Sequence, residues 1–327
     1  MKVAINGFGR IGKNIFKIAL ERKIQIVAIN DLHGAEDAAY ALKYDSVYGN
    51  FKGRVHSSGE NLIVNGKKYP VLSEMDPEKL PWKKLGVDVV IEATGAFTKR
   101  DGAMKHIKAG ARRVIITAPS DDADITLIMG VNENELKKTH EIISIASCTT
   151  NCLAPVVKVL NEKFGIKESF LTTLHAYTAS QNIVDGFHKK RRRGRTAGLN
   201  IVPTSTGATD ALCKAMPEMR GKMSGLAMRV PVASGSIIDF VAHLKKKTSV
   251  DEVNKAFKDA ATKKMKGILY YTEDEIVSSD IIGNIHSSII DGLSTMVQGE
   301  MVKVLAWYDN EHGYSSRVID SLKLLRG

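Results

Sequence analysis

The residue best suited to carry out chemistry is a cysteine, Cys148, in the run Ala-Ser-Cys-Thr-Thr-Asn-Cys at residues 146–152. Residues 141–145 are β-prone, and residues 153–164 carry apolar side chains at helical spacing. The thiol is therefore expected where a strand turns into a helix, with Ser147 as the capping residue. Unpaired amides and the positive end of the helix dipole favour an anion there. We predict a lowered thiol pKa, a nucleophilic role for Cys148 and an oxyanion donor in its backbone amide.

The other two cysteines are expected to be unreactive. Cys152 lies one helical turn beyond Cys148, and Cys213 lies in an apolar, helix-like stretch at residues 209–216. Free cysteine usually behaves as a small buried hydrophobe. Three cysteines in 327 residues also argue against a disulfide framework.

A second motif, Asn-Gly-Phe-Gly-Arg-Ile-Gly, occupies residues 6–12 between a β-prone run and a helical pattern. Gly7 permits a tight turn, Gly9 lets a pyrophosphate approach the backbone, and Gly12 lets helix and strand pack closely. Asp31 follows a second strand, roughly 20 residues beyond the glycines, where a carboxylate can accept hydrogen bonds from an adenosine ribose. This order predicts a dinucleotide site rather than a glycine-rich turn with a capping aspartate.

The elements that position these motifs change character along the chain. Before Cys148, strands at 87–92 and 113–117 flank a helix at 103–109, which is the βαβ pattern of a mostly parallel sheet, and residues 45–72 suggest a local antiparallel excursion. After Cys148, we expect long strands at 169–177, 237–245 and 302–308 and a helix at 249–264.

We therefore predict an α/β Rossmann-type dinucleotide-binding domain, residues 1–147, and an α+β catalytic domain with a mixed or antiparallel sheet, residues 148–312. A C-terminal helix at 313–327 is expected to pack back on the first domain. The sequence contains no apolar run of membrane-spanning length and no signal segment, so a cytoplasmic location is expected.

The most basic run is Lys-Lys-Arg-Arg-Arg-Gly-Arg at residues 189–195, in a chain of net charge +11. It can be a solvated loop, a nucleic-acid patch, or a loop that contacts a neighbouring subunit. No aromatic residue is interleaved with these charges, which weakens the case for single-stranded nucleic acid.

Taken together, several motifs resemble those of the phosphorylating glyceraldehyde-3-phosphate dehydrogenase family over essentially the whole chain. The matching segments are residues 6–12, 30–31, 44–46, 146–151, 175–178, 203–208, 229–231 and 307–311. The resemblance implies that the thiolate of Cys148 adds to an aldehyde, that hydride then passes to NAD, and that inorganic phosphate releases the resulting thioester as 1,3-bisphosphoglycerate. It also implies a homotetramer in which the basic loop lies against a neighbouring subunit, and it implies no metal.

The resemblance assigns individual roles. His175 is the base beside the thiol, a role that suits an imidazole on a strand, and as imidazolium it would lower the thiol pKa. The residues implied to bind the cofactor are Gly7, Gly9, Arg10, Ile11, Gly12, Asp31, Thr94, Thr117 and Asn310. Thr178 and Arg229 are implied to hold the substrate phosphate. The residues implied to hold or neighbour the attacking phosphate are Ser147, Thr149, Arg193, Thr206 and Gly207. The remaining histidines are expected to be surface or satisfied core residues: His33, His56, His106, His140, His188, His243 and His286.

Some positions depart from the family pattern. His312 stands where most members carry tryptophan, and Gly186-Phe187 replaces a Leu-Pro pair common in strictly NAD-using members. We expect NAD as the cofactor, with NADP as a weaker alternative. Two other functions stay open, an erythrose-4-phosphate dehydrogenase that uses water as acyl acceptor and a secondary RNA-binding role.

Overall fold

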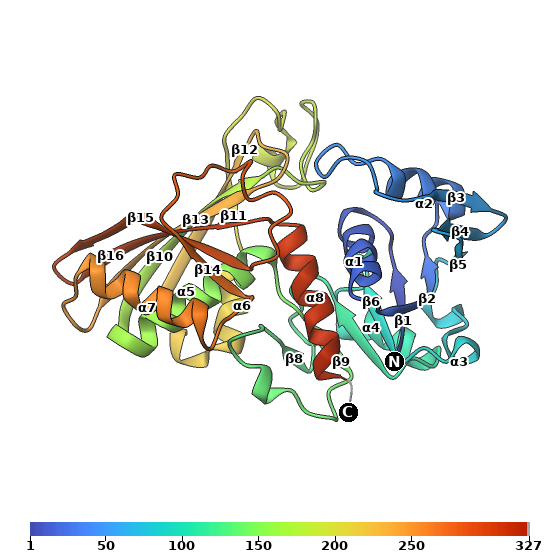
Figure 1. Cartoon of the computed structure of the whole chain (residues 1–327), viewed down its shortest axis with the longest axis horizontal. Coiled ribbons are helices and arrows are strands. Elements are labelled where there is room, and N and C mark those ends of the chain that lie inside the picture. Colours follow the sequence, from blue (N-terminus) through green and yellow to red (C-terminus); the bar gives the residue numbers. More distant parts are fainter. Residues whose placement is uncertain (326–327) are drawn as a thin grey trace. The chain divides into compact units, whose positions relative to one another are not determined.

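The computed structural model describes residues 1–325, which divide into two compact units (Figure 1). Unit 1 comprises Met1–Leu127, Glu133–Ala146 and the chain from Ser315, and unit 2 comprises Ile128–Asn132 and Ser147–Tyr314. The last two residues of the predicted C-terminal helix lie outside the described residues. Within residues 1–325, no helix combines the length and apolar character needed to cross a membrane.

Unit 1 is built on a nine-stranded sheet in the order β3-β4-β5-β2-β1-β6-β7-β9-β8. Its strands are β1 (Lys2–Asn6), β2 (Gln25–Asn30), β3 (Val55–Ser58), β4 (Asn61–Val64), β5 (Lys67–Leu72), β6 (Val89–Glu92), β7 (Arg113–Ile116), β8 (Ile125–Thr126) and β9 (Ile142–Ser144). All pairs from β5 to β8 are parallel, while β3-β4 and β4-β5 are antiparallel. The Rossmann-type prediction and the local antiparallel excursion are thus confirmed.

The central strands of this sheet are almost continuously apolar, as expected of parallel strands covered on both faces. Every residue of β6 is buried, and so are the last four of β1. In this sheet β2 pairs with one edge of β1 and β6, which comes later in the chain, pairs with its other edge. The ends of β1 and β6 therefore form the topological switch point, where open α/β sheets bind their ligands.

Most helices of unit 1 lie between its strands, and the last one comes from the end of the chain. They are α1 (Arg10–Glu21), α2 (Gly34–Lys43), the short α3 (Trp82–Leu85), α4 (Arg100–Lys108) and, from Ser315 on, α8 (His312–Leu324). An ion pair of 2.6 Å between Arg22 Nη1 and Asp320 Oδ1 ties the end of α1 to α8.

Two glycines explain why the β1–α1 turn can form. Gly7 has φ +92°, and a Cβ atom on it would lie 2.7 Å from the backbone nitrogen of Thr94. A Cβ atom on Gly12 would collide with the carbonyl oxygen of Gly7. The turn, the neighbouring strand end and α1 thus approach so closely that no side chain fits between them.

A polar network centred on the buried Glu92 side chain lies beneath this turn. Glu92 accepts hydrogen bonds from Asn6 Nδ2 at 2.6 Å, from Thr94 N at 2.9 Å and from the Thr94 hydroxyl. The indole N–H of Trp82 donates to His106 Nδ1 at 3.0 Å. Because an indole can only donate, His106 carries its proton on Nε2 and gives it to Glu92 at 3.1 Å. The prediction of a satisfied core histidine is confirmed for His106.

Unit 2 is built on a seven-stranded mixed sheet in the order β11-β12-β10-β13-β16-β15-β14. Its strands are β10 (Ile166–Ala176), β11 (Val202–Ser205), β12 (Met223–Val230), β13 (Ser236–Leu244), β14 (Leu269–Thr272), β15 (Ser288–Gln298) and β16 (Met301–Tyr308). The pairs β10-β12 and β14-β15 are parallel and the others are antiparallel. The predicted α+β domain with a mixed sheet is confirmed.

Three helices cover one face of the unit 2 sheet (Figure 1). They are α5 (Cys148–Phe164), α6 (Ala208–Ala215) and α7 (Val250–Thr262). Along β10, Leu171, Thr173 and His175 point into the covered face and are buried, whereas Phe170 and Leu174 point to the other face and are exposed. This alternation places His175 on the side of the sheet that holds α5.

Candidate active site

Cys148 stands at the first position of α5, as the sequence predicts. Ala146 in the preceding turn has φ +55°, a conformation that costs energy for a residue with a Cβ atom and that concentrates at functional sites. Ser147 caps the helix, because its hydroxyl oxygen accepts the backbone N–H of Thr150 at 3.1 Å. The thiol thus sits at the positive end of a 17-residue helix and is half-buried.

His175 lies beside the thiol, with its Nε2 atom 3.4 Å from Cys148 Sγ. Its Nδ1 atom lies 2.7 Å from the Ala176 carbonyl oxygen and 2.7 Å from Arg229 Nη1. A carbonyl only accepts and a guanidinium only donates, so a neutral imidazole can satisfy one of them. With the proton on Nδ1 and donated to the carbonyl, the Nε2 lone pair faces the thiol, which is the geometry of a general base.

Strand register explains the position of Arg229. His175 on β10 pairs with Arg229 on the parallel strand β12, so both side chains emerge on the helix-covered face. Arg229 Nη1 also donates to Ala176 O at 3.0 Å, while its buried Nε–H finds no hydrogen-bond partner among residues 1–325. A buried guanidinium with an unused donor is suited to bind an anion.

The electrostatics correct one expectation. Burial raises the pKa of the Cys148 thiol, although the Arg229 charge and hydrogen bonds at the helix start act in the opposite direction. Burial, and then the Arg229 charge, lower the pKa of His175 to about 3. The expected lowering of the thiol pKa by an imidazolium is therefore wrong for this state of the chain. A neutral thiol faces a neutral imidazole, and the ion pair must form by proton transfer between them.

Tyr308 is a site residue that sequence reasoning did not single out beyond its place in a matching segment. Its buried hydroxyl lies 2.9 Å from Thr149 Oγ1 and 2.8 Å from Thr173 Oγ1, and its ring packs edge-on to His175 at 5.9 Å. It therefore joins α5 to β10 behind the thiol–imidazole pair. Only the alternation of β16 could have indicated that this tyrosine points inward.

A second group of predicted residues gathers around Arg193. Its guanidinium donates to Thr204 Oγ1 at 2.9 Å, to Ser180 Oγ at 3.2 Å and to the Ser205 carbonyl at 3.4 Å. The Thr178 hydroxyl lies 2.9 Å from the same Ser180 hydroxyl. Arg193 also lies close enough to His175 and Arg229 for its charge to lower the pKa of both.

The hydroxyls of the other predicted anion ligands are engaged in hydrogen bonds within unit 2. Thr206 and Gly207 lie at the start of α6, where the Thr206 hydroxyl accepts the Ala208 N–H at 3.2 Å. The hydroxyls of Ser147 and Thr149 are engaged within unit 2, with Thr150 and Tyr308 respectively. The structure brings Thr178 and Arg193 together and Arg229 beside His175, and it shows no hydrogen bond from Ser147 or Thr149 to either arginine among residues 1–325.

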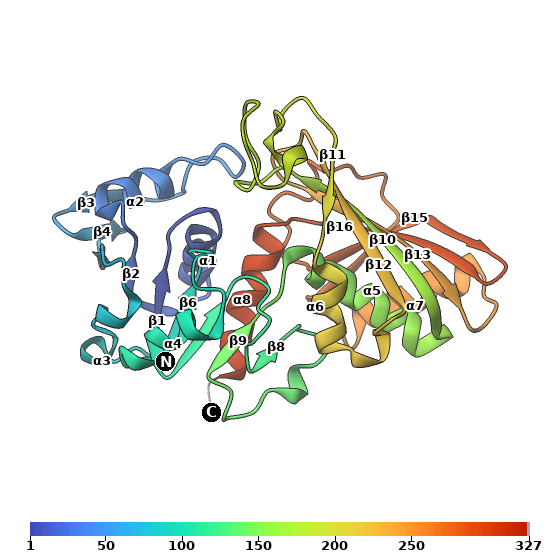
Figure 2. The same ribbon diagram turned by 180° about the vertical axis from the view of Figure 1, so that it is seen from behind.

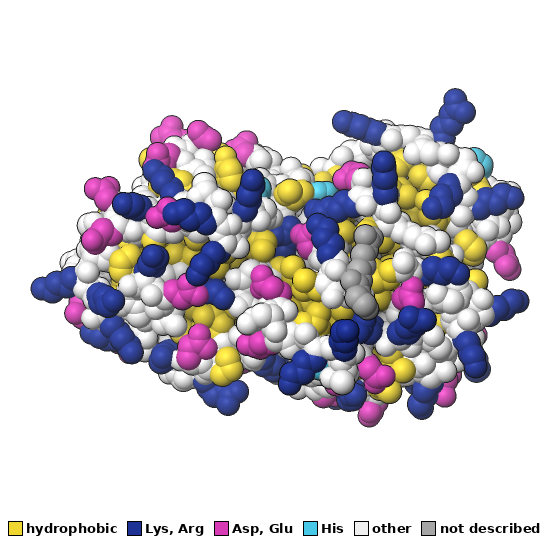
Figure 3. Space-filling model, turned by 60° about the horizontal axis from the view of Figure 1, so that its bottom comes forward, with side chains coloured by type: hydrophobic (Ala, Val, Ile, Leu, Met, Phe, Trp, Pro, Cys, Tyr) yellow, Lys and Arg dark blue, Asp and Glu magenta, His cyan; other side chains and the backbone are white. Residues whose placement is uncertain are grey.

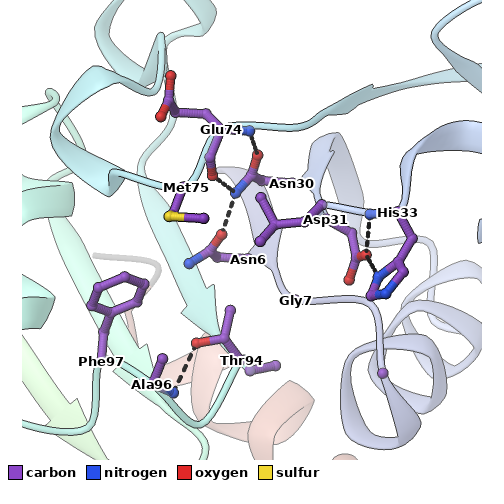
Figure 4. Close-up of a pocket in the computed structure, with 13 residues that line it drawn as sticks. Asn6, Gly7, Asn30, Asp31, His33, Glu74, Met75, Thr94, Ala96 and Phe97 are labelled. Atoms are coloured by element: carbon purple, nitrogen blue, oxygen red, sulfur yellow. Dashed lines mark hydrogen bonds and ion pairs between the residues drawn. The ribbon is translucent and has the colours of Figure 1, made fainter.

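The predicted dinucleotide residues define a pocket in unit 1 (Figure 4). Gly7, Gly9, Asp31 and Thr94 line it, together with residues for which the sequence predicted no individual cofactor role: Asn6, Asn30, Leu32, His33, Glu74, Met75, Ala93, Ala96 and Phe97. Most of these lie at or just after the carboxyl ends of β1, β2, β5 and β6, where open α/β sheets bind their ligands.

Within this pocket the features needed by a dinucleotide are present. A Cβ atom on Gly9 would meet no other atom within 4 Å, so the backbone at the start of α1 is open to a phosphate. Burial disfavours the Asp31 carboxylate, but hydrogen bonds from Phe8 N and His33 outweigh this and lower its pKa. Met75 and Phe97 supply apolar walls, so the residues fit NAD (Figure 4).

The remaining predicted cofactor residues lie elsewhere. Arg10 and Ile11 open α1, and Gly12 packs under the turn. The Thr117 hydroxyl donates to the Glu92 carbonyl at 3.0 Å. In unit 2, Asn310 Oδ1 accepts the N–H of Gly235 at 3.1 Å and the hydroxyl of Ser236 at 3.0 Å, which fixes its side chain.

The basic run at residues 189–195 is only partly free. Arg195 pairs with Asp185 at 2.8 Å, and Lys190 Nζ donates to Ser205 Oγ at 2.6 Å. Figure 2 shows the loop, in yellow-green, projecting past the ends of the unit 2 strands. On the face drawn in Figure 3, Lys and Arg side chains are spread among Asp and Glu rather than gathered in one place.

The fold and the thiol–imidazole pair are those expected of a class of protein, the dinucleotide-dependent dehydrogenases that use a cysteine nucleophile and a histidine base. The model of the glyceraldehyde 3-phosphate dehydrogenase NAD binding domain matches residues 1–100, and that of the C-terminal domain matches residues 147–310. The chain therefore belongs to the glyceraldehyde-3-phosphate dehydrogenase family, whose members are NAD-dependent oxidoreductases.

Similar proteins of known name agree with this assignment. The glyceraldehyde-3-phosphate dehydrogenases of Priestia megaterium and Geobacillus stearothermophilus, and glyceraldehyde-3-phosphate dehydrogenase 1 of Bacillus subtilis, are each 54% identical to the chain over 323 residues. Each alignment covers 98% of this chain and 96% of the relative. The family predicted from the sequence is thus confirmed.

Proposed function

We propose that the chain oxidises glyceraldehyde 3-phosphate to 1,3-bisphosphoglycerate, with NAD and inorganic phosphate, in glycolysis or gluconeogenesis. The observation that carries this proposal is the arrangement of Cys148, His175 and Arg229, which joins a nucleophile, a base and an anion-binding cation in unit 2. The names of the relatives support the substrate.

The chain's own residues suffice for the covalent steps. His175 Nε2 takes the thiol proton while Sγ bonds to the aldehyde carbon, and the proton then goes to the developing alkoxide, which gives a thiohemiacetal. The backbone N–H of Cys148 can stabilise the negative oxygen. NAD, when bound, supplies the hydride acceptor. As hydride leaves, His175 takes the hydroxyl proton, and a thioester forms on Cys148.

Release of the product reverses the role of the base. A phosphate oxygen bonds to the thioester carbon, the carbon–sulfur bond breaks, and the imidazolium returns a proton to the sulfur. The acyl phosphate leaves and the neutral thiol is restored. We propose that Thr178 and Arg229 hold the substrate phosphate and that Arg193, with Ser147, Thr149, Thr206 and Gly207 nearby, serves the attacking phosphate.

The assay that tests this function is aldehyde-dependent reduction of NAD with and without inorganic phosphate. Glyceraldehyde 3-phosphate should support rapid turnover only with phosphate present. A chain that instead oxidises erythrose 4-phosphate at the same rate with and without phosphate would be the sister dehydrogenase that uses water.

Replacement of Arg229 by leucine should raise the KM for glyceraldehyde 3-phosphate at least about tenfold, because a charged hydrogen bond to phosphate contributes about 1.5–3 kcal/mol. The KM for unphosphorylated glyceraldehyde should change much less. Steady-state kinetics with both aldehydes measures the difference, and Arg229→Lys, which retains the charge, is the matched control. Equal losses for both aldehydes would place Arg229 outside the substrate-phosphate site.

Replacement of Asp31 by alanine should remove much of the preference for NAD over NADP. The carboxylate is held in the pocket by Phe8 N at 2.7 Å, where it favours ribose hydroxyls and repels a 2′-phosphate. Such like-charge contact costs several kcal/mol, or about a hundredfold in selectivity. The measurement is kcat/KM for each cofactor at saturating aldehyde and phosphate. A parent enzyme that prefers NADP would show that the loop with Gly186 and Phe187 controls selectivity instead.

We further propose a cytoplasmic homotetramer. Apolar side chains are exposed on the open face of the unit 2 sheet and on the long loop that follows β10, as expected of subunit contacts: Phe170, Leu174, Leu226, Ile183, Val184 and Phe187. All three cysteines are free thiols, which suits a reducing compartment. Light scattering during gel filtration, which gives the mass of the assembly, tests the tetramer.

A further inference from the structure

His33 is a titratable pocket residue to which the family chemistry gives no role. It follows β2 by three residues, and its imidazole Nδ1 lies 2.9 Å from Asp31 Oδ1, which also accepts the His33 backbone N–H at 3.1 Å. The Phe8 N–H occupies the other carboxylate oxygen. Figure 4 shows the ring lying against the Asp31 carboxylate at the edge of the pocket. The group expected to meet the adenosine ribose is therefore a carboxylate–imidazole pair.

The charges around His33 are mostly negative. Asp31 is in contact, and Asp37 and Glu36 stand in the first turn of α2. Glu74 lines the pocket, but Figure 4 shows its carboxylate pointing away from the ring. On α1, Arg10 pairs with Asp45 at 2.9 Å. The His33 imidazole lies in contact with Asp31 and offsets its charge when protonated, and the His33 side chain is 79% exposed.

We propose that His33 sets how strongly the pocket discriminates against a 2′-phosphate, so that binding of NADP improves relative to NAD as the pH falls. With a neutral imidazole, the phosphate of NADP meets the uncompensated charge of Asp31. With an imidazolium, the pair carries no net charge and offers a donor to the phosphate, while the ribose hydroxyls of NAD gain little from the change.

The contact between His33 and Asp31 sets the pH range in which the imidazole is protonated. The hydrogen bond to Asp31 and its charge raise the pKa of His33 above its ordinary value near 6.5. A raised pKa favours the imidazolium, so the cation is present in acid, persists toward neutrality and is lost in alkali. The effect is moderated by solvent, because the ring is largely exposed.

The test is titration calorimetry of NAD and NADP at pH 6.0 and 8.5, with the intact chain and its His33→Asn variant. Asparagine can still donate to Asp31 but does not titrate. In both proteins the ratio of the NADP Kd to the NAD Kd is measured at each pH. The fold-decrease of this ratio from pH 8.5 to pH 6.0 should be at least about threefold larger in the parent than in His33→Asn. His56→Asn, which replaces another exposed histidine of unit 1, should behave as the parent does.

The comparison between variants separates His33 from the cofactor itself, since the 2′-phosphate of NADP also titrates near pH 6. An identical change of the ratio in the parent and in His33→Asn would overturn the proposal. The inference rests on the dinucleotide pocket and not on the aldehyde reaction. Failure to bind either cofactor would contradict the proposed function, whereas NAD binding without the His33-dependent shift contradicts only this inference.

Discussion

The Cys148→Ser enzyme should have no measurable phosphorylating activity. An alcohol is a far poorer nucleophile than a thiolate at neutral pH, and the product of the first step would be a hemiacetal rather than a thiohemiacetal. The loss should be complete because the structure offers no replacement thiol: Cys152, one turn along α5, is fully buried, and burial raises its pKa far above the ordinary value. Turnover of purified protein measures the effect.

The matched control is Cys152→Ser, which should retain most of the activity. Stoichiometric iodoacetamide labelling, mapped by mass spectrometry, should modify Cys148 first, because it is only partly buried and has a base at 3.4 Å. Cys213 is a useful competitor, since it is also only partly buried but its pKa is raised by burial and by neighbouring acidic residues. Preferential labelling of Cys152 or Cys213 would contradict the assignment of the nucleophile.

His175→Asn should lower the turnover number by roughly two to four orders of magnitude, the usual range for loss of a general base. The variant should also slow the alkylation of Cys148 at pH 7, because the thiol proton has no acceptor once Nε2 is removed. Together, turnover and alkylation distinguish a role of His175 in activating the thiol from a role in a later step. Lost turnover with unchanged alkylation would mean that His175 acts later in the reaction and does not activate the thiol.

The same variant should change how stability depends on pH. The folded chain holds His175 neutral, with a pKa of about 3, whereas the unfolded chain binds a proton near pH 6.5. The parent therefore loses stability from this group as the pH falls from about 6.5 toward 3, and the asparagine variant does not. Urea unfolding at pH 7 and pH 5 should show a smaller loss for His175→Asn.

The sequence predicts the parts of the site that lie within one local motif. The strand–turn–helix around Gly7 and the capped helix that begins at Cys148 follow from short-range preferences, and both occur in the structure. Cysteine at the start of a helix also predicted a lowered thiol pKa, and here the prediction is wrong. The helix contribution is present, but removal from water has the larger effect, and burial depends on packing that local patterns do not contain.

Contacts that depend on register could not be predicted. Arg229 reaches His175 because β10 and β12 pair in parallel, and β12 was not among the expected strands. Tyr308 meets Thr149 and Thr173 only after β16, α5 and β10 assemble. His33 was expected to be a surface or satisfied core histidine. Its side chain is exposed, and the structure also places it in the dinucleotide pocket, in contact with Asp31, which the sequence did not indicate.

The placement of the two tryptophans, one in each unit, has a spectroscopic consequence. The chain contains two tryptophans, of which Trp82 is fully buried in unit 1 and Trp307 is half-buried in unit 2, where its indole donates to Asp291. Each unit thus carries its own fluorophore. A Trp82→Phe chain would report unit 2 alone and a Trp307→Phe chain unit 1 alone, so denaturation followed by emission could reveal which unit melts first.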